Sequence, residues 1–332
     1  MPVSINPETI LRDLDGLWAS LAQGDAAASG VLRACAMTLV VAAEDDADAQ
    51  AVGETIAELM HEHPSRAIVL RRSQNENAAL EARVFAQCWM PFGRRQQICC
   101  EEIEITTPAG LLSDIARVIL GLIVPDLPVV LWCRGADWFD SEQFRLLFRL
   151  ADKLILDSAR FGGPRAALAL LASLRHDGYR VGDLAWTRLT GWRELIAQIF
   201  DDGANRRQLA AISRIHITCG GEAAPAGMFY LGAWLQHTLP GAQLEFKSAP
   251  GPGAGVRQIT LRGGALDVVL TMSDGATANG AAVDVLVGGA HRRAILPPGS
   301  DYFLMLEELS ILGPDPVYEA VLPLSRQLAE AP

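Results

Sequence analysis

The sequence predicts an α/β protein: an open, mostly parallel or mixed sheet with flanking helices, followed by a smaller α+β domain with an antiparallel meander. Strand and helix patterns alternate along the first part of the chain, as βαβ units do. The run Val129–Cys133 is apolar throughout, as in a central buried strand. The last third alternates apolar and polar residues between glycine-rich turns. We expect a helix and linker at residues 1–30, a sheet domain at 31–205 and a second domain at 206–332.

Hydrophobic periodicity predicts the elements of the first two parts. Apolar residues recur every three or four positions near the start, where Asn6 and Pro7 suit the beginning of a helix. The strand patterns on either side of Pro91–Arg95 predict a hairpin, and Thr190 is a candidate helix N-cap. The expected helices cover residues 6–22, 47–61, 111–123, 141–150, 163–177 and 183–201, and the expected strands cover residues 35–42, 66–70, 80–90, 96–106, 129–133 and 153–157.

The second domain is predicted from a change of pattern. In Leu266–Met272 every second side chain is apolar, and short glycine-rich turns separate this segment from similar ones, which favours an antiparallel meander. The loop Ala249–Gly255 is rich in glycine and proline and is either a tether or a segment that a partner orders. The expected strands cover residues 212–219, 258–262, 266–272, 283–287 and 292–296, and the expected helices cover residues 226–239 and 316–329.

Charge and hydropathy disfavour several classes of partner. The formal net charge is -11, whereas nucleic acids and anionic membrane surfaces select proteins with a basic footprint. The sequence contains no run of about 20 apolar residues, which is the length that a membrane-spanning helix needs. The start of the chain lacks a basic flank followed by an apolar run. We therefore expect a cytoplasmic protein that binds neither nucleic acid nor membrane.

The strand pattern at residues 96–106 carries two pairs of adjacent reactive groups. None of the six cysteines has the spacing of a C-x-x-C or zinc motif, so reduced and mostly buried thiols are the default in a cytoplasmic protein. A vicinal disulfide between Cys99 and Cys100 is the alternative, which makes this pair a weak redox candidate. Glu101 and Glu102 point to opposite faces and cannot share one proton, whereas Glu102 and Glu104 lie on one face, which is ordinary on the solvated edge strand expected here.

The turns that would hold a cofactor or a nucleophile lack the residues those functions need. The turn Ala42–Asp46 has no glycine, and its carboxylates would repel a pyrophosphate, so no dinucleotide cofactor is expected there. No G-x-S-x-G nucleophile motif occurs, and the scattered histidines predict no metal site. Arg66, Asp157 and Ser158 are candidates for an anion site at the end of the sheet, although Asp157 and Ser158 suit a helix cap better.

Two tryptophans and two arginines stand close together in the sequence after residue 183. Trp186, Arg188, Trp192 and Arg193 are residue types that dominate protein–protein hot spots. Core tryptophans with arginines at helix ends would give the same pattern. These four residues are therefore candidates either for partner binding or for the junction between the domains.

The segment Asp183–Leu195 resembles the D-L-x-W-x-R-L-x-x-W-R block of the OpcA family, the glucose-6-phosphate dehydrogenase assembly proteins. Further blocks are similar to that family and occur in the same order. They are His63–Ala67 (H-P-x-R), Cys99–Ile103 (C-S-E-Q/E), Asp126–Trp132 (D-L-P-x-x-x-W), Asp157–Ser158 (D-S) and Ala233–Leu235 (A-W-L). Cys100 departs from the serine of the family pattern.

This resemblance implies a protein that binds glucose-6-phosphate dehydrogenase and favours its assembled or allosterically competent state, without being a dehydrogenase itself. The absence of a complete catalytic motif in the sequence agrees with that role. The alternative is an enzyme or sensor that binds a sugar phosphate at the carboxyl end of the first sheet. Whether a metabolite binds is left open.

Overall fold

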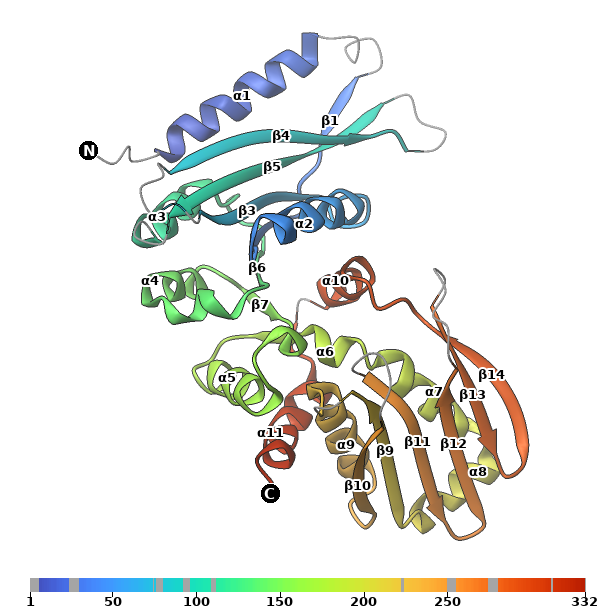
Figure 1. Ribbon diagram of the computed structural model, residues 1–332. Coiled ribbons are helices and arrows are strands. Elements are labelled where there is room, and N and C mark those ends of the chain that lie inside the picture. Colours follow the sequence, from blue (N-terminus) through green and yellow to red (C-terminus); the bar gives the residue numbers. More distant parts are fainter. Residues whose placement is uncertain are drawn as a thin grey trace. The chain divides into compact units, whose positions relative to one another are not determined.

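The computed structural model describes residues 6–23, 30–73, 75, 80–91, 96–108, 112–221, 224–249, 255–273, 280–311 and 313–331. The chain divides into two compact units (Figure 1): Met1–Leu156 with Tyr179–Gly182, and Asp157–Gly178 with Asp183–Pro332. This division falls earlier than the expected boundary near residue 205, because the helix Pro164–His176 packs against the helix Pro316–Glu330 near the end of the chain. The centres of the expected linker at 23–30, turn at 91–95 and loop at 249–255 lie outside the described residues.

The first unit is built on an eight-stranded, mostly parallel sheet, as predicted (Figure 1). The strand order is β1-β5-β3-β2-β6-β7-β8, and β4 pairs with β5. β4 and β5 are antiparallel, which confirms the hairpin, and β2 and β6 are buried along their whole length. The strands are β1 (Val31–Arg33), β2 (Met37–Ala42), β3 (Ser65–Ser73), β4 (Glu81–Trp89), β5 (Gln97–Pro108), β6 (Val129–Cys133), β7 (Lys153–Leu156) and β8 (Val181–Asp183).

Local hydrogen bonds fix the starts of the helices in this unit. Asn6 Oδ1 accepts from the Glu8 N–H at 3.1 Å, and Asp45 Oδ1 accepts from the Asp48 N–H at 2.8 Å. The helix that begins at Pro7, α1, packs against β4 (Figure 1). The helices are α1 (Pro7–Gln23), α2 (Asp46–Leu59), α3 (Leu112–Leu122) and α4 (Glu142–Arg145); 3-10 segments at Ala136–Asp140 and Leu146–Arg149 flank the last one.

The expectation of a solvated edge strand at Glu102 and Glu104 is wrong. β5 lies between β3 and β4, and the side chains of Glu101 and Glu102 are only 3% and 4% exposed. Glu101 accepts hydrogen bonds from Trp18 Nε1 and Arg66 Nε, each at 2.6 Å. Glu102 accepts from Gln87 Nε2 at 2.9 Å, and burial raises its pKa. Donors from distant segments therefore make these buried carboxylates tolerable.

For Cys88 and Cys99, both the default of reduced thiols and the vicinal alternative are wrong. Cys99 forms a disulfide with Cys88, which lies opposite it on β4 in the antiparallel register. Cys100 is a buried free thiol, and burial raises its pKa to about 11. The bond follows from strand register, because directly opposed residues of an antiparallel pair bring their Cβ atoms within disulfide range.

The second unit contains a six-stranded sheet in the order β10-β9-β11-β12-β13-β14. The strands from β11 to β14 form the predicted antiparallel meander, and β10 is parallel to β9. In β12, Leu266, Val268 and Leu270 are buried and Asp267 is exposed, as the alternation predicts. The strands are β9 (Arg214–Gly220), β10 (Gln243–Ala249), β11 (Gly255–Gly263), β12 (Leu266–Met272), β13 (Ala281–Val287) and β14 (Ala290–Leu296).

The helices of this unit differ from the prediction in three places. The expected helix at 183–201 is two helices, and Thr190 is the first residue of the second one, whose N-cap position Leu189 makes no side-chain cap. Neither α8 nor α10 was expected. The helices are α5 (Pro164–His176), α6 (Leu184–Thr187), α7 (Thr190–Asp201), α8 (Gly203–Gln208), α9 (Ala226–Thr238), α10 (Asp301–Ser310) and α11 (Pro316–Glu330). In the part of the chain that the structure describes, no helix is long and apolar enough to cross a membrane.

The disulfide leads to a test. Non-reducing digestion and mass spectrometry should yield one cross-linked peptide that joins Cys88 to Cys99. Because the bond closes a loop with a sequence separation of 11, Cys88→Ser should lower the free energy of unfolding by about 3 kcal/mol. Cys35→Ser is the control, since Cys35 is a free thiol and its loss leaves the link in place. A peptide that joins Cys99 to Cys100 would contradict this assignment.

Candidate functional site

The Trp/Arg segment lies inside the second unit. Trp186 and Trp192 are 4% and 3% exposed. The Trp186 indole donates to Asp315 Oδ2 at 3.1 Å, and the guanidinium of Arg193 lies 3.4 Å from the centroid of its ring. Burial lowers the pKa of Arg193 to about 10. This placement favours a role in holding the second unit together over direct contact of the tryptophans with a partner.

Arg188 forms a bidentate ion pair with Asp157. Arg188 Nη1 donates to Asp157 Oδ1 at 2.7 Å, and Nη2 donates to Oδ2 at 2.5 Å. Asp157 also accepts from the Ala159 N–H at 3.2 Å, which confirms its expected role as a cap. Because both carboxylate oxygens already accept from the guanidinium, this aspartate fixes the position of Arg188 on the α6–α7 turn.

Asp183 is the centre of a buried network that the sequence did not single out. It has no solvent exposure and accepts from the N–H groups of Ser158 and Ala185, each at 2.9 Å. Tyr230 Oη donates to it at 2.8 Å, and Tyr318 Oη lies 3.4 Å from Tyr230 Oη. Burial, and then the charge of Asp157, raise the pKa of Asp183 to about 6. The sequence shows an aspartate between a strand and a helix, but it could not show the tyrosines around it, because Tyr230 and Tyr318 lie far from Asp183 along the chain.

Arg66 does not belong to the carboxyl end of the first sheet. It stands at the amino end of β3, is 7% exposed, and donates to Glu101 and to the Leu122 carbonyl at 2.6 and 2.7 Å. Arg33 forms a second ion pair with Glu101 at 2.6 Å. Arg66 therefore serves a buried structural ion pair, and its expected grouping with Asp157 and Ser158 at one sheet end is corrected.

The β2–α2 turn is filled by the chain's own carboxylates. Asp48 Oδ2 accepts from the Glu44 N–H at 2.9 Å, and the same carboxylate pairs with Arg134 at 2.6 Å. These groups occupy the strand-to-helix turn at which doubly wound folds hold a nucleotide phosphate. Negative charge in the first turn of α2 would oppose such a ligand.

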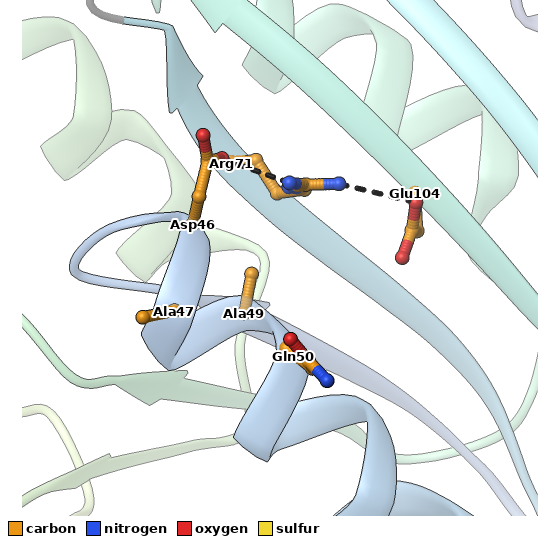
Figure 2. Close-up of a pocket in the computed structure, with 6 residues that line it drawn as sticks. All are labelled: Asp46, Ala47, Ala49, Gln50, Arg71 and Glu104. Atoms are coloured by element: carbon orange, nitrogen blue, oxygen red, sulfur yellow. Dashed lines mark hydrogen bonds and ion pairs between the residues drawn. The ribbon is translucent and has the colours of Figure 1, made fainter.

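A hollow of about 450 Å³ lies beside this turn, and Figure 2 shows Arg71 between Asp46 and Glu104. Arg71 Nη2 donates to Asp46 Oδ1 at 2.8 Å, and Nη1 lies 3.5 Å from Glu104 Oε2. The positive charge of Arg71 is therefore already paired with the carboxylates of Asp46 and Glu104. Among the described residues, no three His, Cys, Asp or Glu side chains gather into a metal-binding group.

The second unit has a larger cavity, of about 810 Å³. Arg188 and Trp192 line it together with residues that the sequence did not suggest, including Arg257, Phe303 and Glu307. No local pattern could have identified these three, because they come from a strand irregularity and from the unexpected helix α10. The lining is mostly apolar with a few polar groups, which is the usual composition of a ligand pocket.

The buried carboxylate at Asp183 makes stability depend on pH. Its pKa is about 6 in the folded protein, against an ordinary value of 3.8. Between these pH values the folded state keeps a proton that the unfolded chain has released, so the free energy of unfolding falls as pH rises from about 4 to about 6. Asp183→Asn should remove this fall, which amounts to about 3 kcal/mol.

Urea unfolding of wild type and Asp183→Asn at several pH values from 4 to 7 measures this difference. Asp202→Asn is the matched control, because Asp202 is an exposed helix cap and its replacement should leave the slope as in wild type. An unchanged slope in Asp183→Asn would show that the carboxylate is not the titrating group.

Comparisons with known proteins agree with the family blocks in the sequence. The family model described as "Glucose-6-phosphate dehydrogenase subunit N-terminal domain" matches residues 56–173, and the model for the C-terminal domain of the same subunit matches residues 179–322. A Synechocystis protein named as the OxPP cycle protein OpcA is 30% identical over 209 residues, covering 62% of this chain and 43% of that protein. A Nostoc punctiforme protein of the same name is 29% identical over 197 residues, covering 58% of this chain and 42% of that protein. The matched region thus spans less than half the length of these relatives.

Two solved structures share the fold. An aldose-aldose oxidoreductase from Caulobacter crescentus has a TM-score of 0.50 at 11% identity, covering 88% of this chain and 95% of that one. The probable oxidoreductase yhhX has the same TM-score and identity, covering 89% and 95% of the two chains. At this identity the likeness concerns the fold alone.

Proposed function

Because the chain belongs to the glucose-6-phosphate dehydrogenase subunit (OpcA) family, we propose that it acts by binding glucose-6-phosphate dehydrogenase and stabilising the assembled, active state of that enzyme. The observation that carries this proposal is the match of the two domain models, which together span most of the chain. The name of the family model supplies the partner.

The acidic β2–α2 turn supports a non-catalytic role. Asp48 accepts the Glu44 N–H and pairs with Arg134, so the turn is neutralised from within the protein. A dinucleotide would have to break this ion pair, and breaking a buried pair costs about 3–5 kcal/mol. A dehydrogenase activity of the chain itself is therefore disfavoured.

An activator of this kind must bind the active state of its partner more tightly than the inactive state, since equal affinity would shift nothing. A tenfold preference corresponds to about 1.4 kcal/mol. A rigid second unit helps, because a preorganised surface loses less conformational freedom on binding. We propose that Trp186, Arg188, Trp192 and Arg193 contribute in this way, by fixing the shape of that unit.

The activator hypothesis predicts a change in the partner. Glucose-6-phosphate dehydrogenase from the same organism should co-elute with this protein in size-exclusion chromatography. In a substrate titration, the mixture should show a higher turnover or a lower apparent KM. Heat-unfolded protein at the same concentration is the control. If the two proteins form no complex and the rate does not change, the hypothesis is wrong.

Trp192→Ala separates a shaping role from an interface role. Truncation of this buried tryptophan should lower the free energy of unfolding by about 3–5 kcal/mol, and it should weaken partner binding only as far as the second unit loosens. Circular dichroism and urea unfolding measure the first effect, and co-elution measures the second. Full stability with lost binding would instead place Trp192 in the interface.

The second hypothesis is a sugar-phosphate enzyme or sensor at the carboxyl end of the first sheet. It is weaker because Arg66 stands at the other end and Arg71 lies between two carboxylates. Because we disfavour this hypothesis, we expect glucose 6-phosphate and 6-phosphogluconate to leave the thermal unfolding of the protein unchanged. A stabilisation approaching about 2.7 kcal/mol, as expected at a hundred times the dissociation constant, would favour this hypothesis instead.

A further inference from the structure

The cavity of about 810 Å³ in the second unit has the size of a small-molecule site, for which volumes of about 300–1,000 Å³ are usual. Residues of β11, β12, β13 and β14 line it, together with residues of the α6–α7 turn, α9 and α10. Since β12 and β13 separate β11 from β14, the cavity spans three strand spacings, or roughly 14 Å.

The side of the cavity at β11 carries positive charge. The register between β11 and β9 shifts between Val256 and Gln258, which makes Arg257 the extra residue of a β-bulge. Bulges redirect a side chain out of the regular alternation, and Arg257 lines the cavity. Arg188 lines it as well, but its charge is balanced by the bidentate ion pair with Asp157.

The start of α9 adds to this charge. Pro225 and Gly227 line the cavity, and the helix that begins at Ala226 has no side-chain cap. The unpaired N–H groups and the dipole of a 13-residue helix favour an anion at its N-terminus. Because α9 packs against β9 and β11, its positive end belongs to the same side of the cavity as Arg257.

The opposite side of the cavity is apolar. Leu296 at the end of β14, Pro297, Pro298 and Phe303 line it. Phe303 is 41% exposed, so an aromatic ring is accessible there. Such a surface suits the face of a ring or a hydrocarbon chain and provides few partners for sugar hydroxyls.

Among the described residues that line this cavity, the carboxylate is Glu307, and it is already engaged. It accepts from Thr190 Oγ1 at 2.6 Å, and the positive charge of Arg193 lies near it. Arg193 in turn donates to Thr190 Oγ1 at 2.7 Å. The carboxylate of Glu307 therefore has a local counter-charge in Arg193.

We infer that this cavity binds a small organic anion with an apolar body, with its phosphate, sulfonate or carboxylate group beside Arg257 and the start of α9 and its ring or chain against Pro297, Pro298 and Phe303. The ligand chemistry is shared by aromatic phosphate esters and aromatic carboxylates. This site is independent of the partner-binding function proposed above.

Two matched dyes test the inference on the full chain. 8-Anilino-1-naphthalenesulfonate carries an anionic group, and N-phenyl-1-naphthylamine has the same aromatic body without it. In fluorescence titrations the sulfonate should bind one saturable site at least about tenfold more tightly than the neutral dye. Equal affinities, or uptake at many sites, would overturn the inference.

Arg257→Gln should weaken sulfonate binding about tenfold and leave binding of the neutral dye unchanged. Arg262→Gln is the matched control, because Arg262 lies on the same strand, is exposed and pairs with Asp267 at 3.0 Å, outside the cavity. Ala281→Phe should weaken both dyes by filling the cavity. Circular dichroism checks the fold of each variant, and equal effects of Arg257→Gln and Arg262→Gln would overturn the inference.

Competition identifies the anionic group and the body of the ligand. Phenyl phosphate and benzoate should displace the sulfonate dye, and the stronger competitor indicates whether the site prefers a phosphate ester or a carboxylate. Glucose 6-phosphate should require at least about tenfold higher concentration, since its hydroxyls must lose water against an apolar wall. Stronger competition by glucose 6-phosphate than by phenyl phosphate would show that the apolar body is not selected.

Discussion

A single carboxylate without solvent exposure, Asp183, connects the segments of the second unit. It accepts from the backbone of Ser158 and Ala185 and from the hydroxyl of Tyr230. Burial of a carboxylate is unfavourable on its own, and three donors offset much of that penalty. Each donor comes from a different stretch of chain, so the aspartate fixes the helix at residue 184, the turn after β7 and α9 in one arrangement. The positions of Trp186 and Arg188 follow from it.

The first unit uses the same device at Glu101. There Trp18 and two arginines, Arg33 and Arg66, surround a carboxylate that is 3% exposed. Arginine suits these positions because its planar group presents several donors in a fixed geometry, whereas lysine offers a point charge. Arginine is far more common than lysine in this chain. At these positions the arginine side chain has a structural use, because its several donors meet a buried carboxylate.

Local patterns predicted the elements whose packing is periodic, and they failed where the answer depended on which strands become neighbours. The alternation in Leu266–Met272 and the apolar run Val129–Cys133 each report burial directly, and both predictions hold. The position of a strand in its sheet leaves no local trace, so the strand that carries Glu102 and Glu104 was placed on an edge. The bond between Cys88 and Cys99 likewise needs the register of two strands. The cavity combines a β-bulge at Arg257 with residues of four helices, and no window of sequence contains them together.

The turn after β2 lacks the glycines that a dinucleotide needs at this place in a doubly wound fold. Here Asp45 caps α2, and Asp48 binds the Glu44 N–H and Arg134. Restoring glycines in the turn would not restore phosphate binding, because Arg134 would then lose its counter-charge and α2 would lose its cap. The acidic turn is therefore tied into the structure, and the chain's own side chains fill the place at which a phosphate would bind.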